Sequence, residues 1–358
     1  MKILLSAGGT AGHIFPAIAL SRELKSRGIE SALIGASGGM EERLATEENL
    51  TFFGVRSGKL DRSNPNPIAL FNALLGVFDA FTVVRRFKPN LVVGFGGFAS
   101  LQGMAGAFLS GTPLAMHEAN AFPGLVTRFF ASRARIIALA DAATQAHLKN
   151  AKTIVVGMPV RETSVPRLEA RAAFGLEPDK FTVLVMGGSQ GSMRLNALLP
   201  PLLERVLTGK NAQVLHQTGR GRLEEVMPKV KHLPWYHCAE FVDGSAAFSA
   251  TDFAITRAGM STIADAGFHG VPLALIPLPS SAENHQVKNA QSLELRGAGL
   301  CILESDLEQE VSGLDGKLVS GMLSCFDTTR QTTWREIVQK NTPAGAAKRL
   351  ADAVLEGL

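Results

Sequence analysis

Short apolar runs alternate with longer segments of helical periodicity from the first residues of the chain. Between two such runs, residues 14–27 carry apolar positions spaced as on one face of a helix. The apolar runs of the N-terminal half predict strands at 2–7, 31–34, 91–94, 114–116, 136–138 and 153–156. Continuous apolar runs are typical of strands buried on both faces, and helices between such strands indicate a parallel sheet. The N-terminal half is therefore expected to be an α/β domain.

A second series of the same kind follows. Its predicted strands lie at 182–186, 212–216, 239–242, 253–256, 273–277 and 301–303. The charged, proline-bearing stretch between the two series is typical of a linker, and 358 residues exceed what one core usually serves. We therefore expect two doubly wound, Rossmann-like domains at 1–160 and 161–343. A final helix within 344–358 is expected to pack back on the first domain.

The two halves also resemble each other at their first strands. The runs at 3–7 and 183–186 each enter a double-glycine turn, Gly8-Gly9 and Gly187-Gly188, shortly before a helix, and a third glycine loop lies at 94–97. Such turns present main-chain N–H groups and the positive end of a helix dipole, so they bind anions without a cationic side chain. We expect two domains that face each other across a cleft, with the ligand at the carboxyl ends of the strands.

Several nucleotide-site classes do not fit these loops. The sequence contains no G-x-x-x-x-G-K-[ST] motif, which argues against a P-loop ATPase or GTPase. The second strand ends in Gly35-Ala36 without an acid for an adenosine ribose, which disfavours a nicotinamide dehydrogenase. Neither a D-x-D motif nor a His/Cys cluster indicates a metal, and no cofactor is expected. If a diphosphate leaves at these loops, main-chain amides and a helix N-terminus must stabilise its charge, which is how a metal-independent sugar-nucleotide transferase would work.

Net charge and cysteine content indicate which partners and which cellular compartment to expect. A formal charge of +4 is too small to indicate nucleic acid, and the three scattered cysteines are typical of free thiols in a reducing compartment. The N-terminal apolar run reaches glycine at Gly8, too early for a signal peptide. The segment 68–84 approaches the length of a membrane span but is interrupted by Asn72 and Asp79. We expect a cytoplasmic protein, soluble or peripheral on a membrane.

The segment 65–88 is the candidate membrane contact. Its large apolar residues form two stripes near helical spacing, one with Ile68, Phe71, Leu75 and Phe78 and one with Leu70, Leu74, Val77 and Phe81. One stripe is expected to pack on the domain, while the other belongs to the core or meets lipid. Basic residues occur nearby in the sequence or domain, at Arg85, Arg86, Lys88, Arg128, Arg133 and Arg135. The pattern suits anionic headgroups, although a buried helix with a solvated basic end explains it nearly as well.

Seven sequence blocks resemble the MurG family, which transfers N-acetylglucosamine from UDP-N-acetylglucosamine to lipid I and so forms lipid II in peptidoglycan synthesis. The blocks lie in the order of the family at 8–17, 94–100, 117–120, 157–161, 187–192 with Asn196, 257–262 and 285–290. The resemblance implies a GT-B fold, inversion at the anomeric carbon, and peripheral attachment to the inner face of the plasma membrane. It also implies roles in cell shape and division beside other cell-wall synthesis proteins.

Carried over motif by motif, the resemblance implies a donor site. Thr10, Ala11 and Gly12 would line the first loop beside the transferred sugar, and Ser189 would contact the diphosphate. The other donor contacts would be Asn120, Arg161, Val242, Met260, Ser261, Thr262, Ile263, Ala264, Asp265 and Gln286. Three positions depart from the family, namely Ala11 for glycine, Ala119 for glutamine and Asp265 for glutamate. The shorter Asp265 carboxylate must lie nearer the ribose or reach it through a water.

Two residues are candidates for acid–base chemistry. His13 lies at the mouth of the first loop, and an imidazole is a common general base near neutral pH, so it could accept the proton of the acceptor hydroxyl. The alternative role is to hold the loop by hydrogen bonds. Glu118, with His117, is a second acid–base candidate at a strand end, and its alternative role is to fix the neighbouring Asn120.

Rival functions remain open from the sequence. One is another GT-B enzyme, such as a glycolipid glycosyltransferase or a UDP-N-acetylglucosamine epimerase. The other is a nucleotide-sugar-binding protein without catalysis, against which the presence of His13 and all three glycine loops argues.

Overall fold

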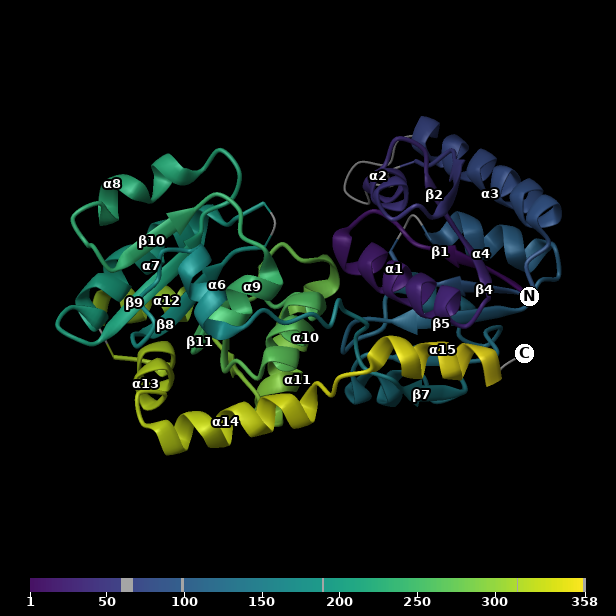
Figure 1. Cartoon of the computed structure of the whole chain (residues 1–358). Coiled ribbons are helices and arrows are strands. Elements are labelled where there is room, and N and C mark those ends of the chain that lie inside the picture. The colour runs from purple at the N-terminus through teal and green to yellow at the C-terminus, as the bar shows by residue number, and fades with distance from the viewer. Residues whose placement is uncertain (59–66, 98–99, 189, 314, 357–358) are drawn as a thin grey trace. The chain divides into compact units, whose positions relative to one another are not determined.

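Two parallel sheets organise the chain, and each lies within its own unit (Figure 1). Unit 1 comprises Met1–Arg161 together with Gly345–Leu358, and unit 2 comprises Glu162–Ala344. The computed structural model describes residues 1–58, 67–97, 100–188, 190–313 and 315–356. The chain therefore passes from unit 1 to unit 2 and returns for its last helix.

Within the described ranges, the sheet of unit 1 has seven strands in the order β3-β2-β1-β4-β5-β6-β7. The strands are β1 (Lys2–Ser6), β2 (Glu30–Ala36), β3 (Thr51–Val55), β4 (Leu91–Gly94), β5 (Leu114–Glu118), β6 (Ile137–Leu139) and β7 (Thr153–Val155). The helices are α1 (Ala11–Ser26), α2 (Met40–Glu47), α3 (Pro67–Phe87), α4 (Ser100–Leu109), α5 (Leu125–Phe130), the 3₁₀ turn η1 (Ala142–His147) and α15 (Ala346–Glu356). The strand order reverses between β1 and β4, which is the topological switch point where such sheets bind ligands.

The described part of unit 2 repeats this plan with six strands in the order β10-β9-β8-β11-β12-β13. The strands are β8 (Phe181–Met186), β9 (Ala212–Gln217), β10 (Tyr236–Ala239), β11 (Phe253–Thr256), β12 (Leu273–Leu275) and β13 (Leu300–Cys301). The α-helices are α6 (Arg167–Ala173), α7 (Met193–Leu207), α8 (Met227–Val230), α9 (Gly244–Ala250), α10 (Met260–His269), α11 (His285–Leu295), α12 (Glu304–Gly313), α13 (Lys317–Ser324) and α14 (Thr328–Asn341). Two 3₁₀ turns are η2 (Leu223–Glu225) and η3 (Ala282–Asn284). The switch point lies between β8 and β11.

Both sheets are buried on both faces, as the continuous apolar runs predict. In β1, Leu4 packs into one apolar cluster while Ile3 and Leu5 pack into another. In β8, Leu184 and Val185 likewise lie in different clusters. Successive side chains of a strand point to opposite faces, so each sheet needs helices on both sides to cover it.

Two strands differ from the sequence prediction. Strand β3 was not among the predicted strands, because the sequence Thr-Phe-Phe-Gly-Val of this edge strand lacks a fully buried run. The strand predicted at 239–242 lies instead at Tyr236–Ala239. Tyr236 packs into the core whereas Phe241 is exposed, so burial selects the earlier register.

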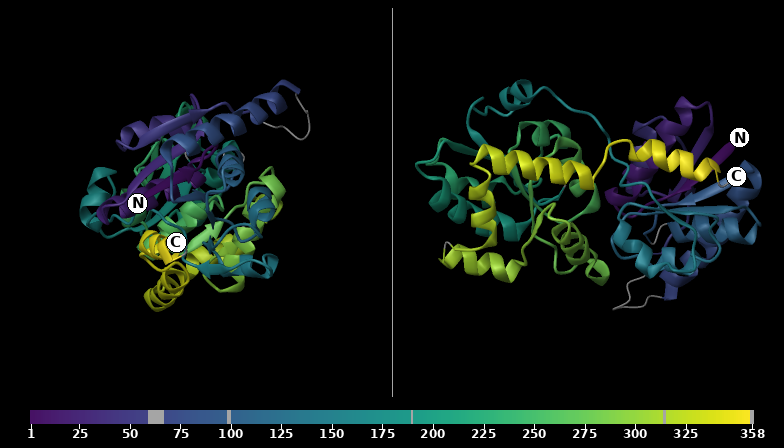
Figure 2. Two further views of the ribbon diagram at one scale, coloured as in Figure 1. Left: turned by 90° about the vertical axis from the view of Figure 1, so that its right-hand side faces the viewer. Right: turned by 90° about the horizontal axis from the view of Figure 1, so that it is seen from below.

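The last helix, α15, completes the core of unit 1 against α1. Leu350 and Val354 lie in one apolar cluster with Leu20 and Leu24 of α1. An ion pair of 2.6 Å between Arg27 and Asp352 supports the same contact. Helices α15 and α3 cover opposite faces of the sheet (Figure 2). Unit 1 is therefore assembled from both ends of the described chain.

Helix α3 packs through small residues rather than through either predicted stripe. Ala73, Gly76 and Ala80 are buried, and a Cβ on Gly76 would overlap the carbonyl oxygen of Arg56. The large apolar side chains that point outward are Ile68, Phe71, Leu74 and Phe78, each at least 60% exposed. The expectation that one large-residue stripe packs on the domain is therefore wrong, because the close approach of α3 to α4 and to the segment after β3 requires small side chains. No helix in the described ranges is long and apolar enough to span a membrane.

Candidate functional site

The first glycine loop connects β1 to α1 and is fixed by a buried carboxylate. Gly9 has φ +83°, a left-handed conformation that favours glycine. Glu41 of α2 accepts hydrogen bonds from Gly9 N at 3.4 Å and from Ala36 N at 2.9 Å. Thr10 caps α1 without using its side chain, so the first main-chain N–H groups of this 16-residue helix lack a side-chain cap. Glu41 was not among the predicted site residues, because it reaches this loop from a separate helix.

His13 joins this loop to the one that follows β4. Its Nδ1 lies 2.9 Å from Thr10 Oγ1. The ring rests against two glycines, because a Cβ added to Gly97 would lie 2.8 Å from His13 Nδ1, and one added to Gly96 would lie 3.6 Å from His13 Cδ2. Both glycines have positive φ. His13 therefore lies at the carboxyl ends of β1 and β4, beside the switch point of the sheet.

Glu118 organises the loop that carries Asn120. It is buried at the end of β5, and its Oε1 accepts hydrogen bonds from Asn120 N at 3.0 Å and Asn120 Nδ2 at 3.3 Å. Its Oε2 accepts from Gly124 N at 3.0 Å and Thr127 Oγ1 at 2.5 Å. Thr144 Oγ1 also donates to the Asn120 carbonyl at 2.7 Å. Four donors thus bond the Glu118 carboxylate, and two of them belong to Asn120. This arrangement is consistent with Glu118 fixing the position of Asn120.

His117, the neighbour of Glu118, is fully buried. Its Nε2 donates to the Gly157 carbonyl at 3.2 Å, and its ring lies 5.8 Å from that of Phe95. Burial lowers the pKa of His117 to about 4, and repulsion from His13 acts in the same direction. His117 is therefore neutral at physiological pH. It links β5 to the segment that leads out of unit 1.

The other donor-site residues predicted in unit 1 lie at three places. Thr10, Ala11 and Gly12 form the start of α1, although the side chain of Ala11 lies outside the described part. Asn120 follows β5 and is half-buried. Arg161 is exposed and is the last residue before the chain enters unit 2.

The second glycine loop connects β8 to α7 in unit 2. Gly188 and Gly191 have φ of +88° and +71°. Ser192 is the N-cap of the 15-residue helix α7, and its Oγ accepts hydrogen bonds from Leu195 N at 3.4 Å and from Arg257 at 2.7 Å. Ser189, the predicted diphosphate contact, lies outside the described residues. The loop itself has the strand–glycine–helix form that binds anions.

Helix α10 brings the predicted residues 260–265 together after β11. Ser261 Oγ is buried and has no hydrogen-bond partner among the described residues. Ile263 packs into the apolar core and Ala264 is buried, so we expect only their main-chain atoms to serve a ligand. Asp265 is half-buried, and desolvation together with repulsion from Asp243 raises its pKa to about 7.

Val242 and Gln286 complete the predicted set in unit 2. Val242 follows β10 and is buried in the apolar core. Gln286 opens α11, and its Oε1 accepts a hydrogen bond from Leu278 N at 2.9 Å. The residues placed in unit 2 therefore follow the carboxyl ends of β8, β10, β11 and β12. This is the edge of a parallel α/β sheet where ligands bind.

Arg257 is an organising residue to which the sequence analysis gave no role. Its guanidinium donates to Ser192 Oγ and to the carbonyls of Ile276 at 3.1 Å and Pro277 at 3.3 Å, and it pairs with Glu304 at 2.7 Å. It thus joins the glycine loop to the segments after β11 and β12. The signal in the sequence is an arginine directly after a buried strand, at the start of the block 257–262.

Family models describe both halves of the chain. The glycosyltransferase family 28 N-terminal domain matches residues 3–139, and the glycosyltransferase family 28 C-terminal domain matches residues 182–340. The chain belongs to glycosyltransferase family 28. The predicted α/β class and the GT-B fold, with two Rossmann-like domains, are confirmed.

Curated relatives match this chain over nearly its whole length. Two of them bear the name UDP-N-acetylglucosamine–N-acetylmuramyl-(pentapeptide) pyrophosphoryl-undecaprenol N-acetylglucosamine transferase. The relative from Deinococcus radiodurans is 44% identical, covering 98% of this chain and 94% of its own, and that from Thermus thermophilus is 39% identical, covering 98% of each. The crystal structure of Acinetobacter baumannii MurG has a TM-score of 0.79 at 24% identity and covers 99% of both chains, which shows a shared fold.

Proposed function

We propose that this family 28 glycosyltransferase transfers N-acetylglucosamine from UDP-N-acetylglucosamine to lipid I, undecaprenyl-pyrophosphoryl-N-acetylmuramyl-pentapeptide. The product is lipid II, the disaccharide precursor of peptidoglycan. The observation that carries this proposal is full-length identity of 44% to a transferase named for that donor and acceptor. The resemblance of the seven blocks to the MurG family points the same way.

The donor is assigned to unit 2. The glycine loop before α7 offers main-chain N–H groups and a helix N-terminus to a diphosphate. The Ser261 hydroxyl has no hydrogen-bond partner in the described part of the chain, and it lies one turn before the Asp265 carboxylate on α10, so both could serve a sugar or ribose bound at this edge. Ser189, Val242, Met260, Thr262 and Gln286, with the main chain of Ile263 and Ala264, are the other donor contacts proposed in unit 2. Charge on departing UDP is then stabilised by main-chain amides.

The acceptor is assigned to unit 1, with His13 as the general base. His13 lies between two glycine loops at the switch point, where its imidazole can receive the proton of the attacking hydroxyl. Glu118 is assigned a positioning role, because its two oxygens already accept four hydrogen bonds. Asn120, held by Glu118, and Arg161 are proposed as further donor contacts.

We also propose peripheral binding to the inner face of the plasma membrane through unit 1. The outward face of α3 exposes Ile68, Phe71, Leu74 and Phe78, and basic residues follow at Arg85, Arg86 and Lys88. Further exposed apolar side chains, absent from the sequence-based stripes, occur on α4 and α5 at Phe108, Leu109, Leu125 and Phe129. Arg133 lies over the rings of Phe108 and Phe129 at 5.2 and 5.5 Å. Apolar groups beside cations suit an anionic lipid surface.

A transfer assay tests the proposed reaction directly. Purified protein is incubated with labelled UDP-N-acetylglucosamine and a short-chain lipid I analogue, without added metal. The expected product is the lipid-linked disaccharide. Transfer only to another lipid acceptor would indicate a glycolipid glycosyltransferase, and an epimerised nucleotide sugar formed without acceptor would indicate an epimerase. Donor binding without turnover in the presence of acceptor would indicate a non-catalytic binding protein.

A further inference from the structure

Buried side chains at the carboxyl end of β9 form a continuous chain of hydrogen bonds in unit 2. His216 Nδ1 lies 2.8 Å from the Tyr236 hydroxyl, and His216 Nε2 lies 3.1 Å from Asn196 Oδ1. Asn196 Nδ2 donates to the Thr218 carbonyl at 3.0 Å and to Glu225 Oε2 at 2.9 Å. His216 and Asn196 are at most 1% exposed. This chain connects two strands to the first turn of α7.

The partners fix the direction of every bond in the chain. Asn196 Nδ2 faces two oxygens that only accept, so Asn196 Oδ1 must accept the proton of His216 Nε2. His216 Nδ1 is then an acceptor, and the Tyr236 hydroxyl donates to it. Burial lowers the pKa of His216 to about 3, and the nearby Lys229 charge acts in the same direction. His216 is therefore held as one neutral tautomer with both ring nitrogens satisfied.

The chain ends where the second glycine loop meets the loop after β9. A Cβ on Gly191 would overlap the Thr218 carbonyl oxygen, and a Cβ on Gly219 would overlap the Gln190 carbonyl oxygen. Gln217 Nε2 also donates to the Gly188 carbonyl at 2.8 Å. The two backbones thus touch without intervening side chains. Any shift of the Thr218 carbonyl, which Asn196 holds, is transmitted directly to the glycine loop.

We propose that His216 and Asn196 are positioning residues that set the backbone of the glycine loop for the diphosphate of the donor. Neither side chain needs to touch the ligand. They act through the Thr218 carbonyl, against which the loop packs. The inference rests on the proposed function, because it assumes that a nucleoside diphosphate binds at this loop.

Two ligands, UDP and uridine, distinguish an effect on the position of the glycine loop from a general loss of stability. Dissociation constants are measured for UDP by calorimetry and for uridine, which lacks the diphosphate, by NMR titration. His216→Leu removes the donor to Asn196, so we expect UDP to bind about tenfold more weakly, as for one lost well-placed hydrogen bond, while uridine changes by less than about twofold. His216→Gln keeps an N–H donor and is expected to restore most of the UDP affinity. Tyr236→Phe removes only the terminal hydroxyl and provides a milder variant if His216→Leu does not fold.

Gln213→Leu is the matched control. Gln213 is a buried residue on the same strand, but its side chain bonds Glu177 and Thr182 at the opposite end of β9. This variant is expected to lose stability while both dissociation constants stay unchanged. Equal weakening of UDP and uridine in the folded His216 and Tyr236 variants, or no weakening of either, overturns the positioning role. A wild-type chain that neither binds UDP nor transfers N-acetylglucosamine overturns the proposed function and the inference with it.

Discussion

Burial lowers the pKa of two histidine side chains in this molecule and raises the pKa of one aspartate. Burial keeps His117 and His216 neutral, with pKa values of about 4 and 3, and it raises the pKa of Asp265 to about 7. Desolvation disfavours the charged form in each case, which is the protonated form of histidine and the ionised form of aspartate. Asp265, a residue of the proposed site, therefore changes its charge near physiological pH.

His13 is the residue on which the proposed chemistry most depends. For His13→Gln we expect turnover to fall by about 100-fold or more, because a positioned general base contributes that much. The KM for UDP-N-acetylglucosamine should stay within about threefold, since the donor is assigned to unit 2. Steady-state kinetics with the lipid I analogue measure both constants. Near-normal turnover would leave His13 with only its contacts to the two glycine loops.

Asp265 gives a prediction on pH. The folded pKa lies above the usual value of 3.8, so the stabilising contribution is complete below that value and is lost as pH rises through about 7. Asp265→Asn should therefore be more resistant to urea than the wild type above pH 7, with the advantage disappearing toward pH 4. If the ionised carboxylate binds the ribose, the wild-type KM for the donor should rise as pH falls below 7. A flat wild-type KM over this range would argue against that contact.

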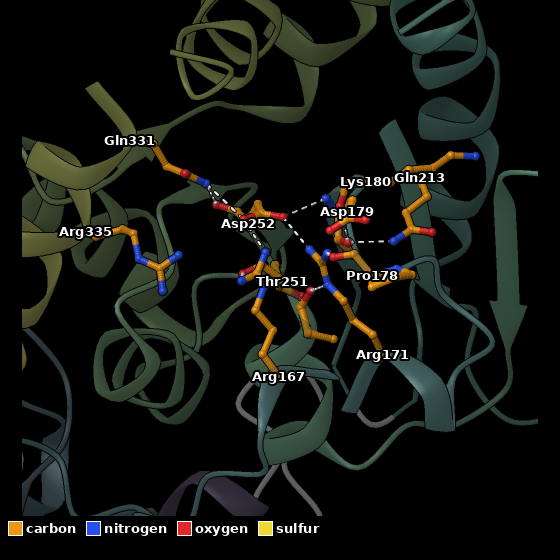
Figure 3. A network of polar contacts seen from close by, with 12 residues as sticks. Arg167, Arg171, Pro178, Asp179, Lys180, Gln213, Thr251, Asp252, Gln331 and Arg335 are labelled. Atoms are coloured by element: carbon orange, nitrogen blue, oxygen red, sulfur yellow. Dashed lines mark hydrogen bonds and ion pairs between the residues drawn. The ribbon is translucent and has the colours of Figure 1, made fainter. Parts of the chain in front are cut away.

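At the scale of elements, a buried carboxylate joins three parts of unit 2 at the amino end of β11 (Figure 3). Asp252 pairs with Arg171 at 2.8 Å and Arg167 at 2.6 Å, both on α6, and accepts from Gln331 of α14 at 3.1 Å. Thr182 N of β8 donates to the same carboxylate at 2.9 Å. Removing one partner from such a network destabilises the fold strongly, because the buried guanidinium of Arg171 is then left without its counter-ion.

Asp252→Asn is expected to destabilise unit 2 without changing its chemistry. Loss of the charge leaves Arg171 buried without a counter-ion, and we expect a cost of about 3 kcal/mol in the free energy of unfolding. Urea denaturation measures the cost. Donor KM should be unchanged below the unfolding transition, since the network lies at the edge of the sheet opposite the glycine loop. An altered KM with normal stability would contradict this assignment.

The elements themselves were largely predictable, and the exceptions share a physical cause. Fully buried strands such as β4 and β8 leave continuous apolar runs in the sequence, whereas the edge strand β3 does not. The packing of α3 through Ala73, Gly76 and Ala80 escaped prediction because large apolar residues dominate the pattern, although small ones permit the close approach.

The proposed site was predictable only as far as local motifs reach. The glycine loops and His13 are adjacent in sequence to the strands that position them, so the sequence pointed to them. Glu41, Gln217 and Arg257 bond those loops from other elements. Their contacts depend on how strands and helices pack, which no local pattern contains.

At the scale of the whole molecule, the outward face of α3 predicts association with membranes. Phe71 and Phe78 are 60% and 66% exposed, and burial of each ring in lipid should contribute about 1.5–3 kcal/mol. The double variant Phe71→Ser and Phe78→Ser should therefore bind anionic vesicles at least about tenfold more weakly in sedimentation assays. Leu295→Ser, which changes an 88% exposed apolar residue of unit 2, is the matched control and should bind normally. Absence of wild-type binding at low salt would refute the membrane contact.

The return of the chain to unit 1 has a consequence for its biosynthesis. The cluster that holds Leu20 and Leu24 also contains Leu350 and Val354 of α15, more than three hundred positions further along. During synthesis, the first Rossmann unit therefore emerges from the ribosome with one side of its apolar core uncovered. Unit 2 can complete its own interior sooner, although its synthesis begins later. Maturation of the earlier-made half must wait for the later-made one, and during that delay the bare flank of α1 is the surface that chaperones would have to shield.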